Sequence, residues 1–397
     1  MSIKTIGVIG GGIVGLSTCL RLLEKNRNIK VLLFEKEPQV GMHQSTHNSG
    51  VLHAGLYYKP GSAKAILAVR GIKQMVEFCR KNDIPHEICG KLVVAVDDEE
   101  LPRLKELYQR GIANGLSGLK FIEKSEIRKY EPNVNGIAAV HVPEEGIVDY
   151  EMVCKRLYEK TLGYGGEVYI NAKVTALSFR NNQWEIRTEK GEYSADYIVN
   201  CAGLHCDRVA RLAGENPDVR IVPFRGEYYN IRKEKEGIVK NLVYPTPDPK
   251  FPFLGVHFTR MIHGGLEAGP NAVLAFSREG YKLSDINLSD LAESLTFPGL
   301  WRFLRKYPQM VKRELSISIS KSVFCKALQR LVPEITEDDL QKGNSGVRAQ
   351  ALDSEGNLVQ DFNIVKRENA LHVLNAPSPA ATSALAIGEH IVSLLPL

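Results

Sequence analysis

The 397-residue sequence lacks the features that mark several protein classes. Its seven cysteines are odd in number and form no C-x-x-C pair, so we expect neither a disulfide framework nor a zinc or other metal site. No apolar run approaches the ~20 residues that a transmembrane helix needs. Lysine and arginine form no block and the formal net charge is only +5, which excludes a nucleic-acid footprint.

The composition is that of a large soluble globular protein. Hydrophobic residues make up 44% and charged residues 24%, and the length allows two domains. The first predicted strand begins within about four residues of Met1, which leaves no room for an export signal and favours the cytoplasm. The apolar end, residues 385–397, could touch a membrane surface peripherally, but a helix packed on its own core is the preferred interpretation.

The most informative segment is a glycine-rich turn within a predicted strand-turn-helix unit, residues 5–25. It contains Gly10, Gly12 and Gly15, and Glu35 follows the next apolar strand. In dinucleotide-binding folds these glycines serve the tight turn, the approach of the pyrophosphate and the close packing of the helix. The pyrophosphate then rests on the helix N-terminus. Glu35 is placed to accept hydrogen bonds from ribose hydroxyls, and its charge disfavours NADP.

The rest of the chain alternates between α/β and β-rich segments. A second α/β crossover is predicted at residues 196–203. Alternating apolar and polar residues predict an antiparallel sheet over residues 221–276. Helices are expected at residues 62–81, 99–111, 288–305 and 315–331, and a last strand at 371–375 leads into a closing helix. This pattern indicates two domains that exchange the chain several times.

Several further segments carry a family signature: residues 43–61, 223–226, 253–258, 269–276, 346–350 and 375–382. They resemble the D-amino-acid-oxidase-like FAD-dependent oxidoreductases, and among these the L-2-hydroxyglutarate dehydrogenase/oxidase family, over nearly the whole length. The resemblance implies an α/β fold with an FAD-binding Rossmann-like domain of the glutathione-reductase/D-amino-acid-oxidase type. An interleaved α+β substrate domain, built on an antiparallel sheet, is also implied. The FAD-binding domain would comprise residues 1–88, 148–222 and 344–397, and the substrate domain 89–147 and 223–343.

The same resemblance implies FAD rather than NAD as the cofactor. Val174 would hold the adenine edge through its main chain, and the turn before the closing helix would face the flavin, where its partial positive charge stabilises an anion. A covalent flavin linkage at His47 is left open. The expected cofactor-binding residues are Gly10, Gly12, Ile13, Val14, Gly15, Glu35, Lys36, Ser45, Thr46, His47, Asn48, Ser49, Val174, Cys201, Ala202, Gly203, Arg348, Pro379, Ala380, Ala381 and Thr382.

A 2-hydroxy acid needs a cation for its carboxylate and a base for its hydroxyl proton. Arg348 matches the substrate-anchoring arginine of the relatives, and a guanidinium binds a carboxylate bidentately. Histidine has an unperturbed pKa of about 6.5, which suits a general base at neutral pH. We prefer His257 as the base and His53 as a flavin or substrate contact, with the reverse assignment open. The candidates for the second carboxylate and the pocket wall are Arg225, Lys59, Arg260, Tyr57 and Tyr58.

The resemblance implies oxidation of a small dicarboxylate, L-2-hydroxyglutarate, to 2-oxoglutarate, with electrons passed to oxygen or a membrane quinone. Two alternatives remain within the superfamily: an FAD-dependent glycerol-3-phosphate dehydrogenase and an amino-acid or amine oxidase. An alternative of another class is a non-catalytic flavin-binding module.

Overall fold

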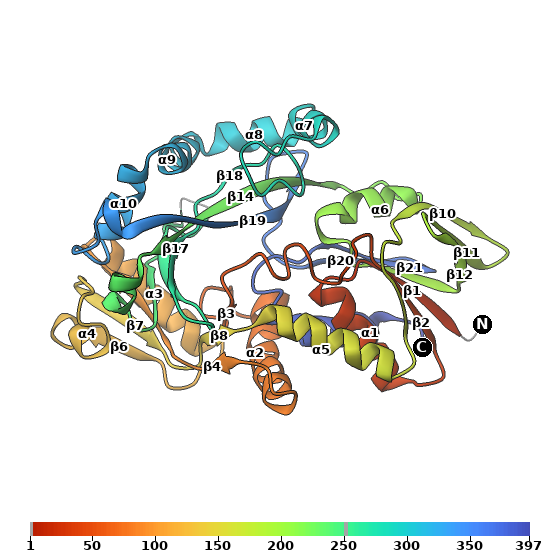
Figure 1. Ribbon diagram of the computed structural model, residues 1–397, viewed down its shortest axis with the longest axis horizontal. Helices are drawn as coiled ribbons and strands as arrows, with labels where there is room; N and C mark the ends of the chain where they lie inside the picture. The colour runs from red at the N-terminus through yellow and green to blue at the C-terminus, as the bar shows by residue number, and fades with distance from the viewer. Residues whose placement is uncertain (1–2, 250–252) are drawn as a thin grey trace.

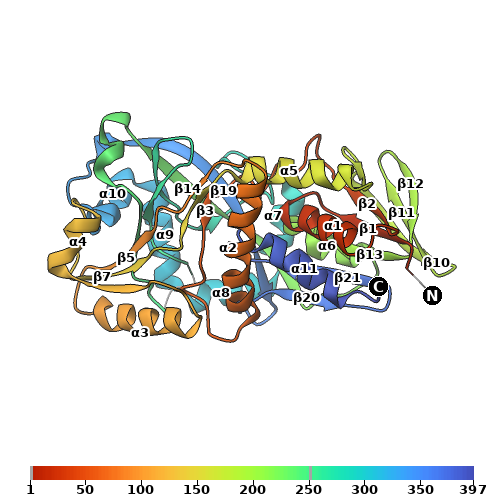
Figure 2. The ribbon, with the colours of Figure 1, turned by 90° about the horizontal axis from the view of Figure 1, so that it is seen from below.

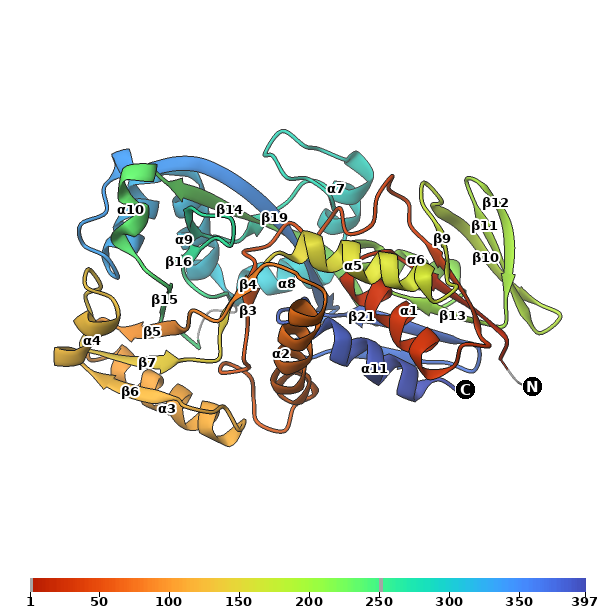
Figure 3. The ribbon, with the colours of Figure 1, turned by 60° about the horizontal axis from the view of Figure 1, so that its bottom comes forward.

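The computed structural model describes residues 3–249 and 253–397, and its two halves lie end to end (Figure 1). One half is built on a mostly parallel six-stranded sheet and the other on a mostly antiparallel nine-stranded sheet. Helix α2 (Ala63–Lys81) lies between the two halves (Figure 2). Both chain ends lie at the outer end of the six-stranded half (Figure 3).

The six-stranded sheet has the order β20-β21-β13-β1-β2-β9, and only β20 is antiparallel. Because parallel strands end at the same edge, the segments that follow β1, β2, β13 and β21 meet there. These segments are the glycine turn, Glu35, residues 201–203 and residues 376–382. The strands are β1 (Thr5–Ile9), β2 (Lys30–Phe34), β9 (Glu167–Tyr169), β13 (Tyr197–Asn200), β20 (Asn363–Lys366) and β21 (Ala370–Asn375).

Helices cover one face of this sheet and a small meander covers the other. The helical layer contains α1 (Ile13–Lys25), α5 (Tyr150–Gly163) and α11 (Ala384–Leu394), whose apolar residues share one core with α2. The meander consists of β10 (Val174–Arg180), β11 (Gln183–Thr188) and β12 (Gly191–Ala195). The closing helix α11 is therefore packed on its own core, as the sequence favoured.

The nine-stranded sheet has the order β18-β14-β17-β16-β15-β5-β7-β6, with β19 paired to β14. The prediction of an antiparallel sheet is confirmed with one exception: β15 runs parallel to β5. The strands are β5 (Lys91–Ala95), β6 (Lys120–Glu123), β7 (Ala138–Val142), β14 (Val219–Ile231), β15 (Leu242–Pro245), β16 (His257–Arg260), β17 (Leu266–Gly269), β18 (Val273–Leu274) and β19 (Leu340–Asp353).

The long pair β14 and β19 connects the two halves (Figure 1). Two of the expected domain boundaries, at 222/223 and 343/344, fall inside these strands. We therefore keep the discontinuous division as a proposal in which β14 and β19 are shared by both halves.

The two long helices expected at residues 288–305 and 315–331 are wrong in their boundaries. The segment forms four helices, α7 (Leu288–Leu295), α8 (Pro298–Lys306), α9 (Pro308–Ile319) and α10 (Lys321–Gln329). Proline lacks an N–H group and is favoured at the first helical position, which explains why α8 and α9 begin at Pro298 and Pro308. Ser320 caps α10 by accepting a hydrogen bond from the Val323 N–H.

Smaller elements complete the described chain. A three-stranded sheet has the order β3-β8-β4. The remaining elements are β3 (Val51–Leu52), β4 (His86–Glu87), β8 (Gly146–Val148), α3 (Glu100–Ala113), α4 (Lys124–Tyr130), α6 (Cys206–Leu212) and 3-10 turns at Gly203–His205, Lys233–Ile238 and Glu337–Asp339.

Candidate active site

The glycine turn has the geometry that its spacing predicts. Gly10 has φ +108°, and a Cβ atom there would lie 2.5 Å from the Cys201 carbonyl oxygen. A Cβ atom on Gly15 would lie 2.0 Å from the Gly10 carbonyl oxygen. A Cβ atom on Gly12 would meet only Ser45 Oγ, at 3.2 Å. The close backbone packing thus requires glycine at positions 10 and 15, whereas Gly12 leaves the N-terminus of α1 open to a ligand.

Glu35 is buried at the end of β2 and fixed by backbone donors. Its Oε2 accepts a hydrogen bond from the Gly11 N–H (2.7 Å) and its Oε1 from the Glu37 N–H (2.9 Å). At the neighbouring α1 N-terminus, Ser45 Oγ accepts from the Ile13 N–H (2.9 Å). A carboxylate beside an open helix N-terminus suits a group with ribose hydroxyls and a pyrophosphate.

A cavity of about 1600 Å³ runs from this turn into the nine-stranded half. Most of the predicted site residues line it, from Glu35 and Val174 at one end to His257 and Arg348 at the other. Residues 201–203 and 379–382 also line it, as expected. Gly15 and Thr46 do not: Gly15 packs α1, and Thr46 Oγ1 donates to the Gly41 carbonyl (2.8 Å), which shapes the loop.

His257, on β16, is held as a neutral imidazole. Its Nδ1 is 2.8 Å from the Gly255 carbonyl oxygen, which can only accept, so Nδ1 carries the proton and Nε2 is free to accept one. Its ring stacks on Tyr244, with centroids 3.8 Å apart. Burial is the main cause that lowers the pKa of His257 to about 3; the Gly255 hydrogen bond opposes this shift, and the positive charges of Lys91 and Arg348 add to it. His257 therefore has the state of a general base.

His53 lies beside a buried ion pair formed by Lys91 and Glu145. The side chains of Lys91 and Glu145 are in direct contact and both are 0% exposed. Lys91 Nζ is 3.3 Å from His53 Nδ1, and the Ala54 N–H donates to Glu145 Oε1 (3.0 Å). Burial and the Lys91 charge lower the pKa of His53. Burial alone would raise the pKa of Glu145, but Lys91 and His53 lower it to about 2.

The expected arginines separate into one that reaches the cavity and two that do not. Arg348, on β19, lines the cavity and donates to the Asn271 carbonyl (3.1 Å). The expectation that Arg225 binds a substrate carboxylate is corrected by the structure. Its side chain is 1% exposed, pairs with Glu227 (2.8 Å) and does not line the cavity. Arg260 likewise pairs with Glu87 away from the cavity. Neither is placed to bind a substrate carboxylate.

Tyr57, Tyr58 and Lys59 lie in the cavity wall as predicted. Tyr57 Oη is buried and has no hydrogen-bond partner among residues 3–249 and 253–397, which leaves it available to a ligand. Lys59 is exposed at the cavity edge. Thr382 joins the turn before α11 to the loop of His53, because its Oγ1 accepts from the His53 N–H (3.2 Å).

The remaining loop residues also lie on the cavity wall. His47 is exposed and its ring stacks on Tyr281, with centroids 4.2 Å apart. Asn48 holds the loop in shape, since its side chain donates to the Gln44 and Ser45 carbonyls and accepts from the Gly50 N–H. Ser49 lines the cavity. These contacts fix the shape of the loop along the cavity.

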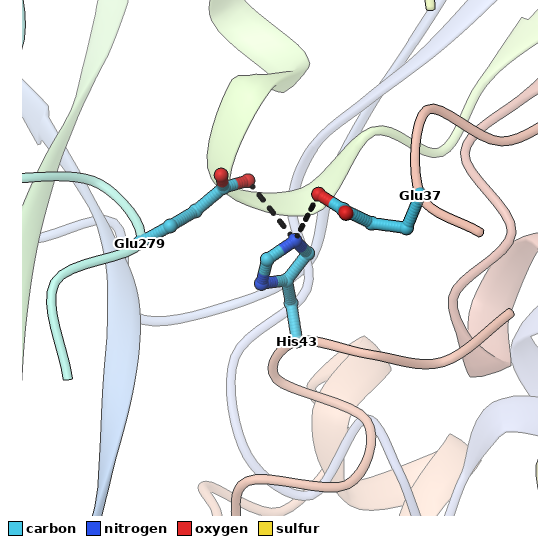
Figure 4. A group of neighbouring side chains, drawn as sticks. All are labelled: Glu37, His43 and Glu279. Carbon is cyan, nitrogen blue, oxygen red and sulfur yellow. Dashed lines mark hydrogen bonds and ion pairs between the residues drawn. The ribbon is translucent and has the colours of Figure 1, made fainter. Parts of the chain in front are cut away.

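Glu37, His43 and Glu279 form a cluster whose geometry could hold a metal ion (Figure 4). His43 Nε2 is 3.0 Å from a Glu37 oxygen and 3.2 Å from a Glu279 oxygen. The ammonium of Lys36 forms ion pairs with both carboxylates: its Nζ contacts Glu37 and lies 2.7 Å from Glu279. Although burial raises the pKa of Glu279, His205 and Lys36 lower it to about 2. Lys36 therefore offsets part of the negative charge of this cluster.

Sequence reasoning missed three buried side chains of the site, Lys91, Glu145 and Tyr244. Lys91 begins an otherwise apolar strand, and a lysine in such a run is a weak signal of a buried charge. Glu145 is followed by Gly146, at which a Cβ atom would lie 2.1 Å from the Glu87 carbonyl oxygen. The sequence alone does not show this constraint, because it arises from the contact of two segments that are far apart in the chain.

Comparisons with known proteins agree with this geometry. The family model for FAD dependent oxidoreductases matches residues 5–394. The chain is 53% identical to L-2-hydroxyglutarate dehydrogenase of Indibacter alkaliphilus, over 96% of each chain. It is 43% identical to the Escherichia coli protein of that name, over 97% of this chain and 92% of the relative. L-alpha-glycerophosphate oxidase of Mycoplasma pneumoniae, solved with FAD bound, shares the fold with a TM-score of 0.80 at 23% identity. The match covers 100% of this chain and 96% of that protein.

Proposed function

This chain belongs to the FAD dependent oxidoreductase family and, within it, to the L-2-hydroxyglutarate dehydrogenases, and from that membership we propose that it oxidises L-2-hydroxyglutarate to 2-oxoglutarate. The observation that carries the proposal is the cavity itself. It joins a dinucleotide turn to a neutral histidine with a free Nε2 and to a cavity-lining guanidinium. A base and a cation are what a 2-hydroxy acid requires.

FAD fits the residues at the first end of the cavity. The open backbone at Gly12, the N-terminus of α1 and the carboxylate of Glu35 would hold its pyrophosphate and ribose, and Val174 and residues 201–203 would line its adenine half. The loop of His53 and the turn at Thr382 would hold the ring system. When bound, the flavin supplies a two-electron acceptor for hydride.

The chain's own residues supply the rest of the reaction. Arg348 binds one carboxylate of the substrate and so orients the carbon that bears the hydroxyl. His257 Nε2 takes the hydroxyl proton, while the hydride leaves the same carbon and the carbonyl of 2-oxoglutarate forms. The two electrons leave with the hydride and the proton stays on His257. Lys59 is the remaining expected cation for the second carboxylate.

Anaerobic flavin reduction tests the function. The purified protein is mixed with L-2-hydroxyglutarate, D-2-hydroxyglutarate, lactate and glycerol 3-phosphate in a stopped-flow instrument, and bleaching of the flavin absorbance is followed. We expect rapid bleaching with the L enantiomer alone. Preference for glycerol 3-phosphate would refute the proposed substrate, and no bleaching with any substrate would favour a non-catalytic flavin-binding module.

The electron acceptor is proposed to be a membrane quinone reached by peripheral contact, on the cytoplasmic side. Among the described residues, no helix is long and apolar enough to cross a bilayer. Large apolar side chains are instead exposed along α7 to α10, the helices that run from the top to the left side of Figure 1. Leu315 and Ile319 are 47% and 83% exposed and share one face of α9 with the exposed Lys312. Apolar side chains beside a lysine suit an anionic lipid surface.

Flotation with phosphatidylglycerol-containing vesicles tests this contact. We expect the protein to float with the vesicles and the double variant Leu315→Glu/Ile319→Glu to remain unbound. The matched control Ile66→Glu/Ile112→Glu replaces exposed isoleucines of α2 and α3 and should float like the wild type. Equal flotation of both variants would refute the assignment of the surface. Reduction of a soluble quinone analogue in air, compared with oxygen uptake, identifies the acceptor.

A further inference from the structure

The buried pair Lys91–Glu145 is the one fully buried lysine–carboxylate contact among the described ion pairs. It joins β5 to the segment before β8, and neither residue lines the cavity. Burying two charges costs several kcal/mol per ion, and apolar replacements of such pairs are often neutral or stabilising. Stability alone therefore does not account for its position directly behind His53.

The pair decides which nitrogen of His53 carries a proton. An ammonium group can only donate a hydrogen bond, and Lys91 Nζ lies 3.3 Å from His53 Nδ1. Glu145 Oε2 lies 3.7 Å from the same nitrogen, which is too far for a hydrogen bond. Nδ1 is thus the acceptor, and in the neutral ring the proton is on Nε2. His53 lines the cavity, so Nε2–H is the donor it can offer there.

His257 has the opposite arrangement. Its Nδ1 donates to the Gly255 carbonyl, so its Nε2 accepts. The two imidazoles are connected through Lys91, whose Nζ lies 4.1 Å from the centroid of Tyr244, the ring on which His257 stacks. The charge of Lys91 thus opposes the protonation of both His53 and His257.

We propose that Lys91 and Glu145 form a positioning pair that fixes His53 as a hydrogen-bond donor, through Nε2–H, to an anionic oxygen of the substrate. Glu145 holds Lys91 in place and clamps the Ala54 backbone, and Lys91 supplies the hydrogen bond that sets the tautomer. The hydroxyl proton then has one destination, His257 Nε2, because His53 has no free acceptor nitrogen. The assignment of the oxygen to a substrate rests on the function proposed above.

The test is the tautomer of His53 in the flavin-loaded protein. Histidine is labelled with ¹⁵N, ring nitrogen shifts are measured by NMR, and His53→Asn assigns the signal. We expect Nε2–H in the wild type. In Lys91→Met the nearest charged group left beside Nδ1 is the carboxylate of Glu145, so Nδ1 should gain the proton and the pKa of His53 should rise. Nδ1–H in the wild type, or an unchanged tautomer in Lys91→Met, would overturn the proposal.

Flavin reduction by L-2-hydroxyglutarate gives the second readout. Lys91→Met should slow it by about 10- to 100-fold, by analogy with the loss when a partner that orients a metal-bound histidine is removed. The charged groups that face His53 are Lys91, Glu145 and Lys64, and with Lys91 gone the negative charge of Glu145 dominates. Because protonated His53 again carries a hydrogen on Nε2, the loss of rate in Lys91→Met should be smaller at low pH than at high pH. A slower rate with no change in the pH profile would indicate a purely structural role.

Two further variants keep the test conclusive. Lys91→Met/Glu145→Leu removes both charges, and should fold, show a mixture of His53 tautomers and remain slow; a single Nε2–H tautomer there would refute the proposal. Glu131→Gln is the matched control, because Glu131 is equally buried but accepts from the Lys240 and Asn241 N–H groups outside the cavity. It should leave the His53 signal unchanged. The NMR result does not depend on the substrate, so failure of the proposed function is recognised separately, in the wild type.

Discussion

Replacing His257 by asparagine removes the proposed base while keeping much of its surroundings. The asparagine amide N–H can donate to the Gly255 carbonyl in place of Nδ1, which is 2.8 Å from that oxygen. What is lost is Nε2 and part of the stack on Tyr244. General-base catalysis is worth ~10²–10⁴ in rate, or about 3–5 kcal/mol of activation free energy. We expect flavin reduction by L-2-hydroxyglutarate to slow by that factor, with flavin content unchanged.

The pH dependence makes this prediction sharper. Because burial, Lys91 and Arg348 lower the pKa of His257 to about 3, the imidazole of the free enzyme is already neutral at pH 5. The kcat/KM for flavin reduction should therefore show no decline caused by His257 between pH 8 and pH 5, where an ordinary histidine would titrate. Stopped-flow reduction across that range measures it. A decline with a midpoint near 6.5 that disappears in His257→Asn would refute the buried, neutral state; a near-normal rate in the variant would refute the role of base.

Four further outcomes are expected. Arg348→Ala should weaken substrate binding by about 2–5 kcal/mol, seen as a raised KM with flavin retained, and Arg348→Lys should recover only part of that binding. A normal KM in Arg348→Ala would exclude the anchoring role. Gly12→Val should abolish flavin binding while circular dichroism shows an intact fold. Gly15→Val should also lower the Tm, because its Cβ atom would clash with the Gly10 carbonyl oxygen. Stoichiometric FAD in Gly12→Val would count against the pyrophosphate site. Stability should fall as pH drops from about 6.5 toward 3, because the unfolded imidazole of His257 binds a proton that the buried one rejects, and the Tm of His257→Asn should fall less steeply. Lactate should reduce the flavin more slowly than L-2-hydroxyglutarate, since it has no second carboxylate to pair with Lys59; because Lys59 is exposed, we expect a modest difference.

The first half of the fold could be predicted because its signals are local. The glycine turn, the strand before it and the acidic residue after the next strand lie within one short segment, and each has a backbone reason that the structure confirms at Gly10 and Gly15. The alternation around His257 also predicted its orientation, since Val256 and Phe258 are buried in the core while His257 lines the cavity. Pro298 marks the break between α7 and α8 in the sequence, because proline favours the first position of a helix.

The choice between Arg225 and Arg348 could not be made from the sequence, because it depends on the register of two distant strands. In the pairing of β14 with β19, Arg348 lies opposite Phe224 and Arg225 lies opposite Val347. Directly opposed residues share a face and neighbours along a strand alternate, so the two arginines project from opposite faces of the sheet. A shift of one residue in this pairing would turn one strand over relative to the other and place both arginines on the same face of the sheet. The same long-range dependence hid Lys91 and Glu145, whose contact exists only because β5 and the segment before β8 meet behind the loop of His53.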